Sequence, residues 1–203
     1  MKLYYSPGAC SLSPHIVALE AGIPLELKKV DLGKKTLEDG SDYKAVNPKG
    51  YVPALEVSPG KVLTEGPAIV QYLADQKPDS GLAPKNGTWE RYKVQEALNF
   101  VTSELHKGMG ALFNPAVTPE WRKGVMDRLD LRLKALDDML GERDYVAGDA
   151  FSVADAYLFT VLGWAKPLKI DLSPYKNVGA YLARVGARPA VQEAMKAEGL
   201  TKG

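Results

Sequence analysis

The architecture follows from Leu3-Tyr4-Tyr5-Ser6-Pro7-Gly8-Ala9-Cys10-Ser11-Leu12-Ser13, close to the start of the chain. This segment begins as an apolar strand pattern, breaks at Pro7-Gly8 and continues as a helical pattern whose first turn carries Cys10. A strand that turns directly into a helix leaves unpaired backbone N–H groups at the helix start, and the helix dipole favours an anion there. Two interpretations remain open. Cys10 is a small apolar filler, or a thiolate is held here, either that of Cys10 or the sulfur of a bound ligand.

The same segment opens a strand–helix–strand pattern. A strand is expected over residues 1–5, a helix over 9–21 that stops at Gly22, and a second strand over 25–30. Such crossovers pair their strands in parallel and with a right-handed connection. A polar loop at 34–42 and a short helix at 42–46 follow, and then a β-hairpin and a further helix complete an α/β domain.

The hairpin and its helix contain three residues of interest. Pro53 opens the first hairpin strand, where either a plain strand start or a cis bond that aims the Val52 backbone groups outward fits the sequence. Thr64 is the expected N-cap of the following helix, with Pro67 in its first turn. Glu65 is then an acidic residue at a helix N-terminus, either as the common stabilising choice there or with a functional role.

A linker composition over residues 77–88 separates this part from the remainder, in which strand patterns are absent. The sequence therefore predicts two domains, an α/β domain at 1–80 and an all-helical bundle at 86–203. The longest expected helix runs for about six turns from Trp89 to Leu112. The other helices are expected over 119–140, 153–164, 174–185 and 189–197.

The segment Ser152-Val153-Ala154-Asp155 has the form of a capping box, in which Asp155 replaces the usual Glu or Gln. The residues after it are almost all apolar, and a helix that is apolar on every side belongs in a core. We therefore interpret Ser152 and Asp155 as structural, because a buried helix end must satisfy its own N–H groups.

Composition excludes several functions. The chain has 203 residues, a net charge of +1 and no long basic run, which argues against nucleic-acid binding. No apolar run reaches the roughly 18 residues of a membrane span, and no signal-peptide pattern is present. One cysteine fits a reducing cytosol, and one cysteine with two distant histidines makes no usual zinc set. Neither a phosphate-binding loop, a dinucleotide glycine pattern nor a nucleophile elbow occurs.

The remaining chemistry centres on the thiol. Cys10 and Ser13 form a C-x-x-S pattern, so Cys10 has no internal partner and pairs only with an external thiol. His15 fits a packed or capping histidine of the first helix. His106 and Lys107 either lie on a solvated helix face or point at the first domain, where their positive charge would lower a thiol pKa.

With these residues in hand, the chain resembles a cytosolic glutathione S-transferase and is most similar to the bacterial beta class, including transferases associated with biphenyl degradation. The resemblance covers essentially the whole chain. It rests on the motifs Ser-Pro-Gly-Ala-Cys-Ser, Asn47-Pro48-x-Gly50-Tyr51-Val52-Pro53, Leu63-Thr64-Glu65-Gly66-Pro67-Ala68-Ile69 and Phe151-Ser152-Val153-Ala154-Asp155.

The resemblance implies a thioredoxin-like N-terminal domain, a helical C-terminal domain and a cytoplasmic homodimer that uses glutathione without a metal. It implies that Val52, before a cis Pro53, pairs with the cysteinyl backbone of glutathione, that Glu65 and Gly66 bind its γ-glutamyl end, and that Lys35 meets its glycine carboxylate. The family usually has Ser or Thr where Gly66 stands, so the γ-glutamyl carboxylate would rely more on backbone N–H groups here. From the helical domain, the resemblance implies that further residues line the glutathione site, some of them across the dimer: Asn99, Ser103, Glu104, Leu105 and His106.

The implied reaction is attack of a glutathione thiolate on a small electrophile, by conjugation or reductive dehalogenation. In the beta class the residue that matches Cys10 lies near the glutathione sulfur, whereas other classes use a Tyr or Ser hydroxyl. The activating group is therefore open among Cys10, Tyr5 and Ser11, with His106 assisting. The electrophile pocket is expected near Phe113, Tyr157 and Trp164. Two alternatives are a glutathione-dependent thiol–disulfide or peroxide reductase acting through Cys10, and a non-catalytic glutathione- or ligand-binding protein.

Overall fold

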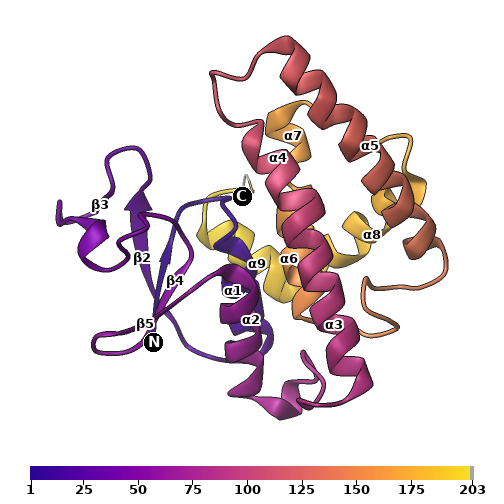
Figure 1. Ribbon diagram of the computed structural model, residues 1–203. Coiled ribbons are helices and arrows are strands. Elements are labelled where there is room, and N and C mark those ends of the chain that lie inside the picture. Colours follow the sequence, from indigo (N-terminus) through magenta and orange to yellow (C-terminus); the bar gives the residue numbers. More distant parts are fainter. Residues whose placement is uncertain (202–203) are drawn as a thin grey trace. The chain divides into compact units, whose positions relative to one another are not determined.

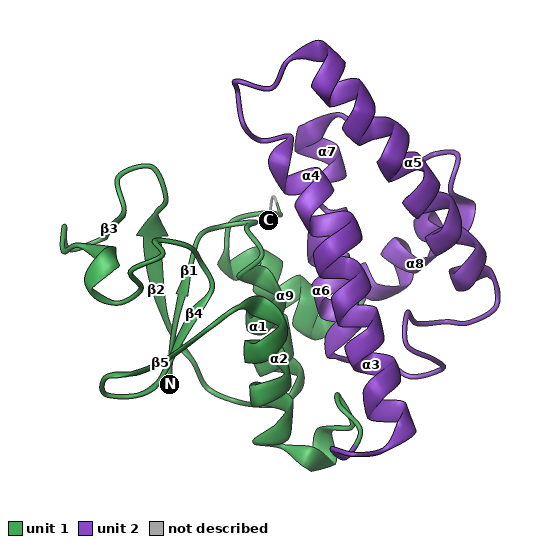
Figure 2. Cartoon of the chain, in the orientation of Figure 1, with its two compact units in different colours: residues 1–84, 188–203 green, residues 85–187 purple. Residues whose placement is uncertain are grey.

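The computed structural model describes residues 1–201, which form two compact units (Figure 2). Unit 1 consists of residues 1–84 together with the C-terminal segment from Arg188, and unit 2 consists of residues 85–187. The sequence predicts domains at 1–80 and 86–203. The units differ from these ranges at the C-terminal end, because the last helix belongs to unit 1. Residues 202 and 203 of the predicted second domain lie outside the described residues.

Unit 1 is built on a five-stranded sheet of order β3-β2-β1-β4-β5 (Figure 1). β1 pairs with β2 in parallel, as the strand–helix–strand pattern predicts, and every other pairing is antiparallel. The two-residue β3 falls in the stretch that we expected to be a loop. The strands are β1 (Lys2–Tyr5), β2 (Glu26–Asp31), β3 (Thr36–Leu37), β4 (Ala54–Ser58) and β5 (Lys61–Thr64).

The helices of unit 1 bury their apolar residues between themselves and the sheet. α1 packs against α2 and α9, and α2 packs against β4 and β5. Leu3 on β1 and Ile16 on α1 are completely buried. Tyr4 points to the other face of β1, as strand alternation requires, and packs with Tyr43 in a second cluster. The helices are α1 (Leu12–Glu20), η1 (Tyr43–Ala45), α2 (Gly66–Asp75), η2 (Pro78–Ser80) and α9 (Pro189–Ala197).

The described secondary structure of unit 2 is helical apart from an isolated β-bridge between Tyr145 and Gly148. α6 lies at its centre and packs against α3, the π-helix η3 and α8. This helix is buried along almost its whole length, as its apolar sequence predicts. The elements are α3 (Trp89–Phe100), η3 (Val101–His106), α4 (Lys107–Ala111), α5 (Pro119–Gly141), α6 (Val153–Leu162), α7 (Ala165–Leu168) and α8 (Lys176–Gly186). Together with the sheet of unit 1, this bundle confirms the predicted fold class.

The prediction of one continuous α-helix from Trp89 to Leu112 is wrong at residues 101–106, where η3 is a π-helix. Two hydroxyls donate to backbone carbonyls one turn back there. Thr102 Oγ1 is 2.8 Å from the Leu98 oxygen, and Ser103 Oγ is 3.0 Å from the Asn99 oxygen. Such back-bonding competes with the helical N–H groups and loosens the turn. A π-turn of this kind often marks a functional segment.

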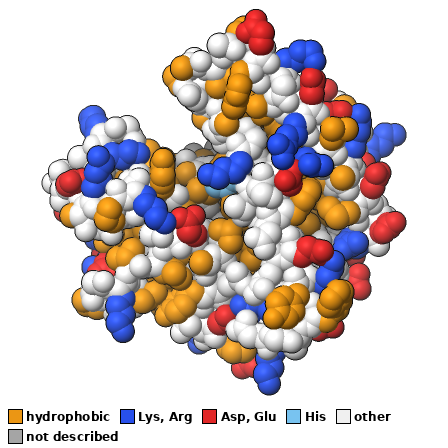
Figure 3. Space-filling model, viewed as in Figure 1, with side chains coloured by type: hydrophobic (Ala, Val, Ile, Leu, Met, Phe, Trp, Pro, Cys, Tyr) orange, Lys and Arg blue, Asp and Glu red, His pale blue; other side chains and the backbone are white. Residues whose placement is uncertain are grey.

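The structure also corrects the start of α2 and confirms the start of α6. The N-cap of α2 is Glu65 rather than Thr64, because Glu65 carries the left-handed backbone (φ 72°) that turns β5 into the helix. At α6 the capping box of Ser152 and Asp155 is formed as predicted. No helix within residues 1–201 is long and apolar enough to cross a membrane. Charged side chains of both signs are spread over the visible face (Figure 3), in keeping with the small net charge.

Candidate functional site

The loop between β1 and α1 is closed by Ser11. Its hydroxyl accepts a hydrogen bond from the Ser6 N–H at 3.1 Å and donates to the Ser6 carbonyl at 3.2 Å. Ser11 is completely buried. The hydroxyl therefore holds the loop that presents Cys10, and its own donor is used within the loop.

Cys10 lies against the segment that leads into β4. Its thiol donates to the Val52 carbonyl, with Sγ 3.2 Å from the oxygen. Burial raises the pKa of the Cys10 thiol to about 11, and the Glu65 charge adds to the increase, while backbone N–H groups of the loop act in the opposite direction. Unit 1 by itself therefore favours a protonated Cys10, opposite to the lowered pKa that positive charge from His106 would give.

The Val52–Pro53 peptide bond is cis, as the resemblance implies. The preceding Tyr51 carbonyl accepts hydrogen bonds from the Tyr43 hydroxyl and the Asn47 side-chain amide, both at 2.8 Å. Within residues 1–201 the Val52 N–H has no hydrogen-bond partner, although Val52 itself is buried. Buried backbone N–H groups are nearly always paired, so this one is available to an extended ligand.

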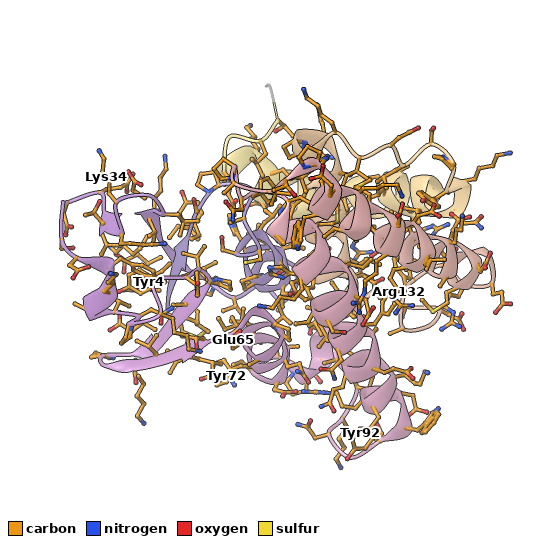
Figure 4. The ribbon with its side chains drawn as sticks, turned by 45° about the horizontal axis from the view of Figure 1, so that its top comes forward. Tyr4, Lys34, Glu65, Tyr72, Tyr92 and Arg132 are labelled. Carbon is orange, nitrogen blue, oxygen red and sulfur yellow. The ribbon has the colours of Figure 1, made fainter. Side chains whose placement is uncertain are left out.

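Glu65 stands between β5 and α2 (Figure 4). A positive φ is costly for a residue other than glycine and is typical of functional positions. The Glu65 carboxylate is exposed and lies 2.7 Å from the Lys49 ammonium. Gly66 is the first residue of α2, and its N–H has no acceptor within the helix. This turn can therefore bind both an anion and a cation. The N-terminus of α2 attracts the anion, and the Glu65 carboxylate attracts the cation.

Lys35 approaches the same segment from the loop before β3. Its backbone also has a positive φ, 59°. The ammonium donates to the Gly50 carbonyl at 3.0 Å and lies 5.7 Å from the centre of the Tyr51 ring. Gly50 has φ 65°, and a Cβ there would lie 3.3 Å from the Lys35 side chain. Glycine at position 50 thus allows Lys35 to lie along the loop that leads to Val52.

Tyr5 ends β1 and is partly buried. Burial raises the pKa of its phenol, and the charges of Glu198 and Glu38 raise it further. The phenol is therefore a hydrogen-bond donor at neutral pH, like the Cys10 thiol.

Unit 2 carries the other predicted residues on and beside η3. The exposed Asn99 and Ser103 donate their side-chain hydrogen bonds to carbonyls of their own helix. The carboxylate of Glu104 accepts from Arg132 at 2.5 Å and from Arg128 at 3.3 Å, and hydrogen bonding by Arg132 lowers the pKa of Glu104. Both arginines come from α5, where Figure 4 labels Arg132. Leu105 is completely buried, so its side chain belongs to the core.

His106 is the last residue of η3 and belongs to an aromatic cluster. Its Nδ1 is hydrogen-bonded to the hydroxyl of Tyr157 on α6. Its ring meets the ring of Trp164 edge to face, with centroids 4.8 Å apart, and Phe113 packs in the same way on Trp164 at 5.8 Å. Phe113 is half exposed, while Tyr157 and Trp164 are buried. These are the three residues that we expected beside an electrophile pocket.

The structure thus assembles two sets of predicted residues, each within its own unit. In unit 1, Cys10, Val52 and Glu65 come together, and in unit 2, His106 lies with Tyr157 and Trp164. The sequence reasoning missed Lys49 and the hydrogen bond between Tyr157 and His106. The motif that begins at Asn47 contains position 49 and could have drawn attention to Lys49. No local sequence pattern connects His106 and Tyr157, because they are 51 positions apart. No group of three or more possible metal ligands occurs in the described part of the chain.

Family models match both units. The model of the glutathione S-transferase N-terminal domain matches residues 8–76, and that of the C-terminal domain matches residues 100–189. Glutathione S-transferase GstA of Escherichia coli is 48% identical over 200 residues, which cover 98% of this chain and 100% of that protein. The chain belongs to the glutathione S-transferase family.

Two solved structures are closely similar. A ternary complex of BphK, a bacterial glutathione S-transferase, is 56% identical with a TM-score of 0.97, over 98% of this chain and 100% of that one. A sphingomonad glutathione S-transferase in complex with glutathione is 49% identical with a TM-score of 0.95, over 99% of this chain and 100% of that one. These matches span the whole fold, so the similarity covers the regions of both sets of residues.

Proposed function

We propose that this chain conjugates glutathione to small hydrophobic electrophiles, or removes a halide from them reductively, by means of a glutathione thiolate. The observation that carries the proposal is the unpaired N–H of buried Val52 beside the start of α2, in a chain of this family. An extended peptide with an acidic end fits that pair of features, because the N–H pairs with its backbone and the helix start receives its carboxylate.

The three parts of glutathione find separate partners in unit 1. The cysteinyl backbone pairs with Val52 before Pro53. The γ-glutamyl end lies at Glu65 and Gly66, where the carboxylate takes backbone N–H groups and Glu65 takes the ammonium. The glycine carboxylate meets Lys35. This last role requires the Lys35 ammonium to exchange its bond to the Gly50 carbonyl for a charged partner, which is a stronger acceptor.

The ionised sulfur is that of glutathione rather than that of Cys10. The Cys10 thiol and the Tyr5 phenol both have raised pKa values, so both stay protonated at neutral pH. Each serves the glutathione thiolate as a donor, and for Cys10 this requires the thiol to exchange its bond to the Val52 carbonyl for the charged sulfur. Ser11 is committed to its loop. His106 supplies a further donor, and Phe113 and Trp164 line the side of the electrophile. Asn99, Ser103, Glu104 and Leu105 lie on or beside the helix segment that carries His106.

The working form is a cytoplasmic homodimer. Three aromatic side chains support the dimer, because Tyr51, Trp89 and Tyr92 are 69%, 73% and 58% exposed. Exposed aromatic groups of this size are typical of surfaces that bind another protein. Sedimentation equilibrium gives the number of subunits, and a monomer at micromolar concentration would contradict this part of the proposal.

Ionisation of bound glutathione tests the function directly. Ultraviolet absorbance of the thiolate is followed against pH, and the thiol pKa is expected to fall by about two units on binding, which corresponds to about 2.7 kcal/mol of thiolate stabilisation. Turnover of 1-chloro-2,4-dinitrobenzene is measured on the same sample. Glu65→Gln raises the KM for glutathione about tenfold, since it removes a charged hydrogen bond. Glu193→Gln, an exposed position on α9, is the matched control.

An unshifted thiol pKa together with no turnover of any electrophile would overturn the proposal. Neither alternative function is favoured. A reductase acting through Cys10 needs an accessible thiolate, and the raised pKa of Cys10 opposes one. The chain is similar to transferases along both units, and this similarity does not favour the alternative of a binding protein without catalytic activity.

A further inference from the structure

The proposed reaction gives a role to His106 but none to Tyr157, although the two residues form a hydrogen-bonded pair. The pair joins Nδ1 of a partly exposed imidazole at the end of η3 to the hydroxyl of a phenol on α6 that is only 1% exposed. The two residues are 51 positions apart, so packing of two helices creates the contact. A buried partner of this kind determines how an imidazole is oriented and which of its nitrogens carries the proton.

Two further contacts restrict the imidazole ring. Trp164 meets it edge to face at an interplanar angle of 85°. On the next turn of helix, Gly110 has no side chain, and a Cβ there would lie 3.5 Å from Cδ2 and 4.0 Å from Nε2 of His106. The ring is therefore packed against the indole of Trp164, and the missing side chain of Gly110 leaves the space beside both rings open on the α4 side.

The chemistry of the pair favours one direction of hydrogen bonding. A phenol is a good donor and a weak acceptor, whereas the lone pair of a neutral imidazole nitrogen is a good acceptor. The stable arrangement has the Tyr157 O–H donating to Nδ1, which leaves the single imidazole proton on Nε2. Without the hydroxyl, neutral histidine interconverts between its two tautomers.

We propose that Tyr157 is a positioning residue: it fixes His106 as the tautomer protonated on Nε2 and directs that N–H to the sulfur of glutathione. The proposal rests on the proposed function, because His106 must act on a glutathione thiolate. His106 donates a hydrogen bond to that thiolate, and Tyr157 acts only through His106. Tyr157 thereby orients His106, a role distinct from lining a pocket for the electrophile.

Nitrogen NMR of the wild-type protein tests the tautomer without any assay of activity. The chain contains two histidines, His15 and His106, so ¹⁵N-histidine labelling gives two ring spin systems, and His106→Asn assigns them. Near pH 8 we expect a pyridine-like Nδ1 and a pyrrole-like Nε2 for His106. In Tyr157→Phe, which keeps the buried ring, we expect averaged shifts of both nitrogens. Tyr175→Phe is the matched control, because that hydroxyl is bonded to Asp130 instead.

Steady-state kinetics separates positioning from packing. In Tyr157→Phe the kcat with 1-chloro-2,4-dinitrobenzene falls about tenfold, the size of one net hydrogen bond in the transition state, and the KM for glutathione changes less than twofold. Combining Tyr157→Phe with His106→Asn costs no more than His106→Asn alone, because the two residues act as a unit. Tyr175→Phe leaves both constants unchanged.

A wild-type His106 protonated on Nδ1 overturns the proposal, and so does a Tyr157→Phe protein with unaltered imidazole shifts and unaltered kcat. Additive losses in the double variant overturn it as well, since Tyr157 would then act independently of His106. Absence of turnover in the wild-type protein overturns the proposed function instead, and the NMR result still decides whether Tyr157 fixes the tautomer.

Discussion

At Cys10, burial and hydrogen bonding act in opposite directions on the same sulfur. The backbone N–H groups of Cys10 and Ser11, just before α1, favour a thiolate, but the loss of water is the larger effect and raises the pKa to about 11. The thiol then donates to the Val52 carbonyl. A cysteine at a helix start is therefore not always reactive, because solvation decides between thiol and thiolate.

Alkylation of Cys10 by iodoacetamide measures this balance. Because only the thiolate reacts, a pKa of about 11 in place of 9.0 lowers the rate at pH 8 by about 100-fold relative to the chain unfolded in urea. The rate then rises with pH and levels off above about pH 11. Mass spectrometry follows the single modification. An inflection below pH 9 in the folded protein would contradict the assigned direction.

At the residue scale, the sequence identified the important side chains more reliably than it identified the role of each one. Cys10, Val52 and Glu65 were identified from motifs, because a strand-to-helix turn, a strand-opening proline and a helix start have local signatures. The commitment of Ser11 to the Ser6 backbone has no such signature, since it depends on how the loop closes. Tyr157 was assigned to a pocket, and its bond to His106 depends on helix packing.

The start of α6 shows how one carboxylate can organise several elements. Asp155 accepts from the Ser152 N–H and hydroxyl, both at 2.9 Å, and from the Val146 N–H at 2.8 Å, and it also receives the Tyr181 hydroxyl at 3.2 Å. The bond from the Ser152 N–H belongs to the capping box, and the bonds from Val146 and Tyr181 tie the preceding loop and α8 to α6. Burial raises the pKa of this carboxyl, and the hydrogen bonds oppose the increase.

Asp155→Ala is expected to lower the free energy of unfolding by about 3 kcal/mol, more than the 1–2 kcal/mol typical of a cap alone, because it leaves several buried donors unpaired. A urea titration followed by circular dichroism measures the change. The exposed Asp149 in the same loop supplies the control, and Asp149→Ala is expected to change stability by less than about 0.5 kcal/mol. Equal effects of the two substitutions would show that the buried network contributes nothing.

At the element scale, periodicity predicted most helices and strands but not their irregular parts. The apolar steps from Trp89 to Leu112 fit a regular helix, and the π-turn at η3, where two hydroxyls bond back to carbonyls, leaves those apolar steps intact. β3 has only two residues, too few for an alternating pattern. Thr64 looked like the cap of α2 because capping preferences do not report a left-handed backbone at Glu65.

The C-terminal segment completes unit 1 as a whole. Glu198 is buried and accepts from the Gly8 N–H at 2.9 Å, and its other oxygen lies 3.0 Å from Nδ1 of His15. At the opposite end of α9, Arg188 forms a paired hydrogen bond with Glu20 of α1 at 2.6 and 2.9 Å. The last helix is thus attached both to α1 and to the loop that carries Cys10. The periodicity of apolar residues does not indicate which unit a helix packs against. The sequence therefore assigned α9 to the helical domain, whereas in the structure it belongs to unit 1.

Glu198→Ala is expected to loosen unit 1 while unit 2 stays protected. The substitution leaves the Gly8 N–H and the buried His15 without their carboxylate, at a cost of about 2 kcal/mol or more. Hydrogen exchange followed by mass spectrometry should show faster exchange in residues 1–84 and no change in residues 85–187. Glu193→Ala, on the exposed side of α9, is the comparison. Faster exchange spread evenly over both units would contradict this role.

The order of synthesis gives this attachment a further meaning. On the ribosome the sheet of unit 1 emerges before unit 2, yet the helix that completes unit 1 emerges only after the whole of unit 2. A premature stop codon near position 187 would leave a finished helical unit joined to an unfinished sheet unit. Quality-control proteases that recognise exposed apolar surface would then remove the product.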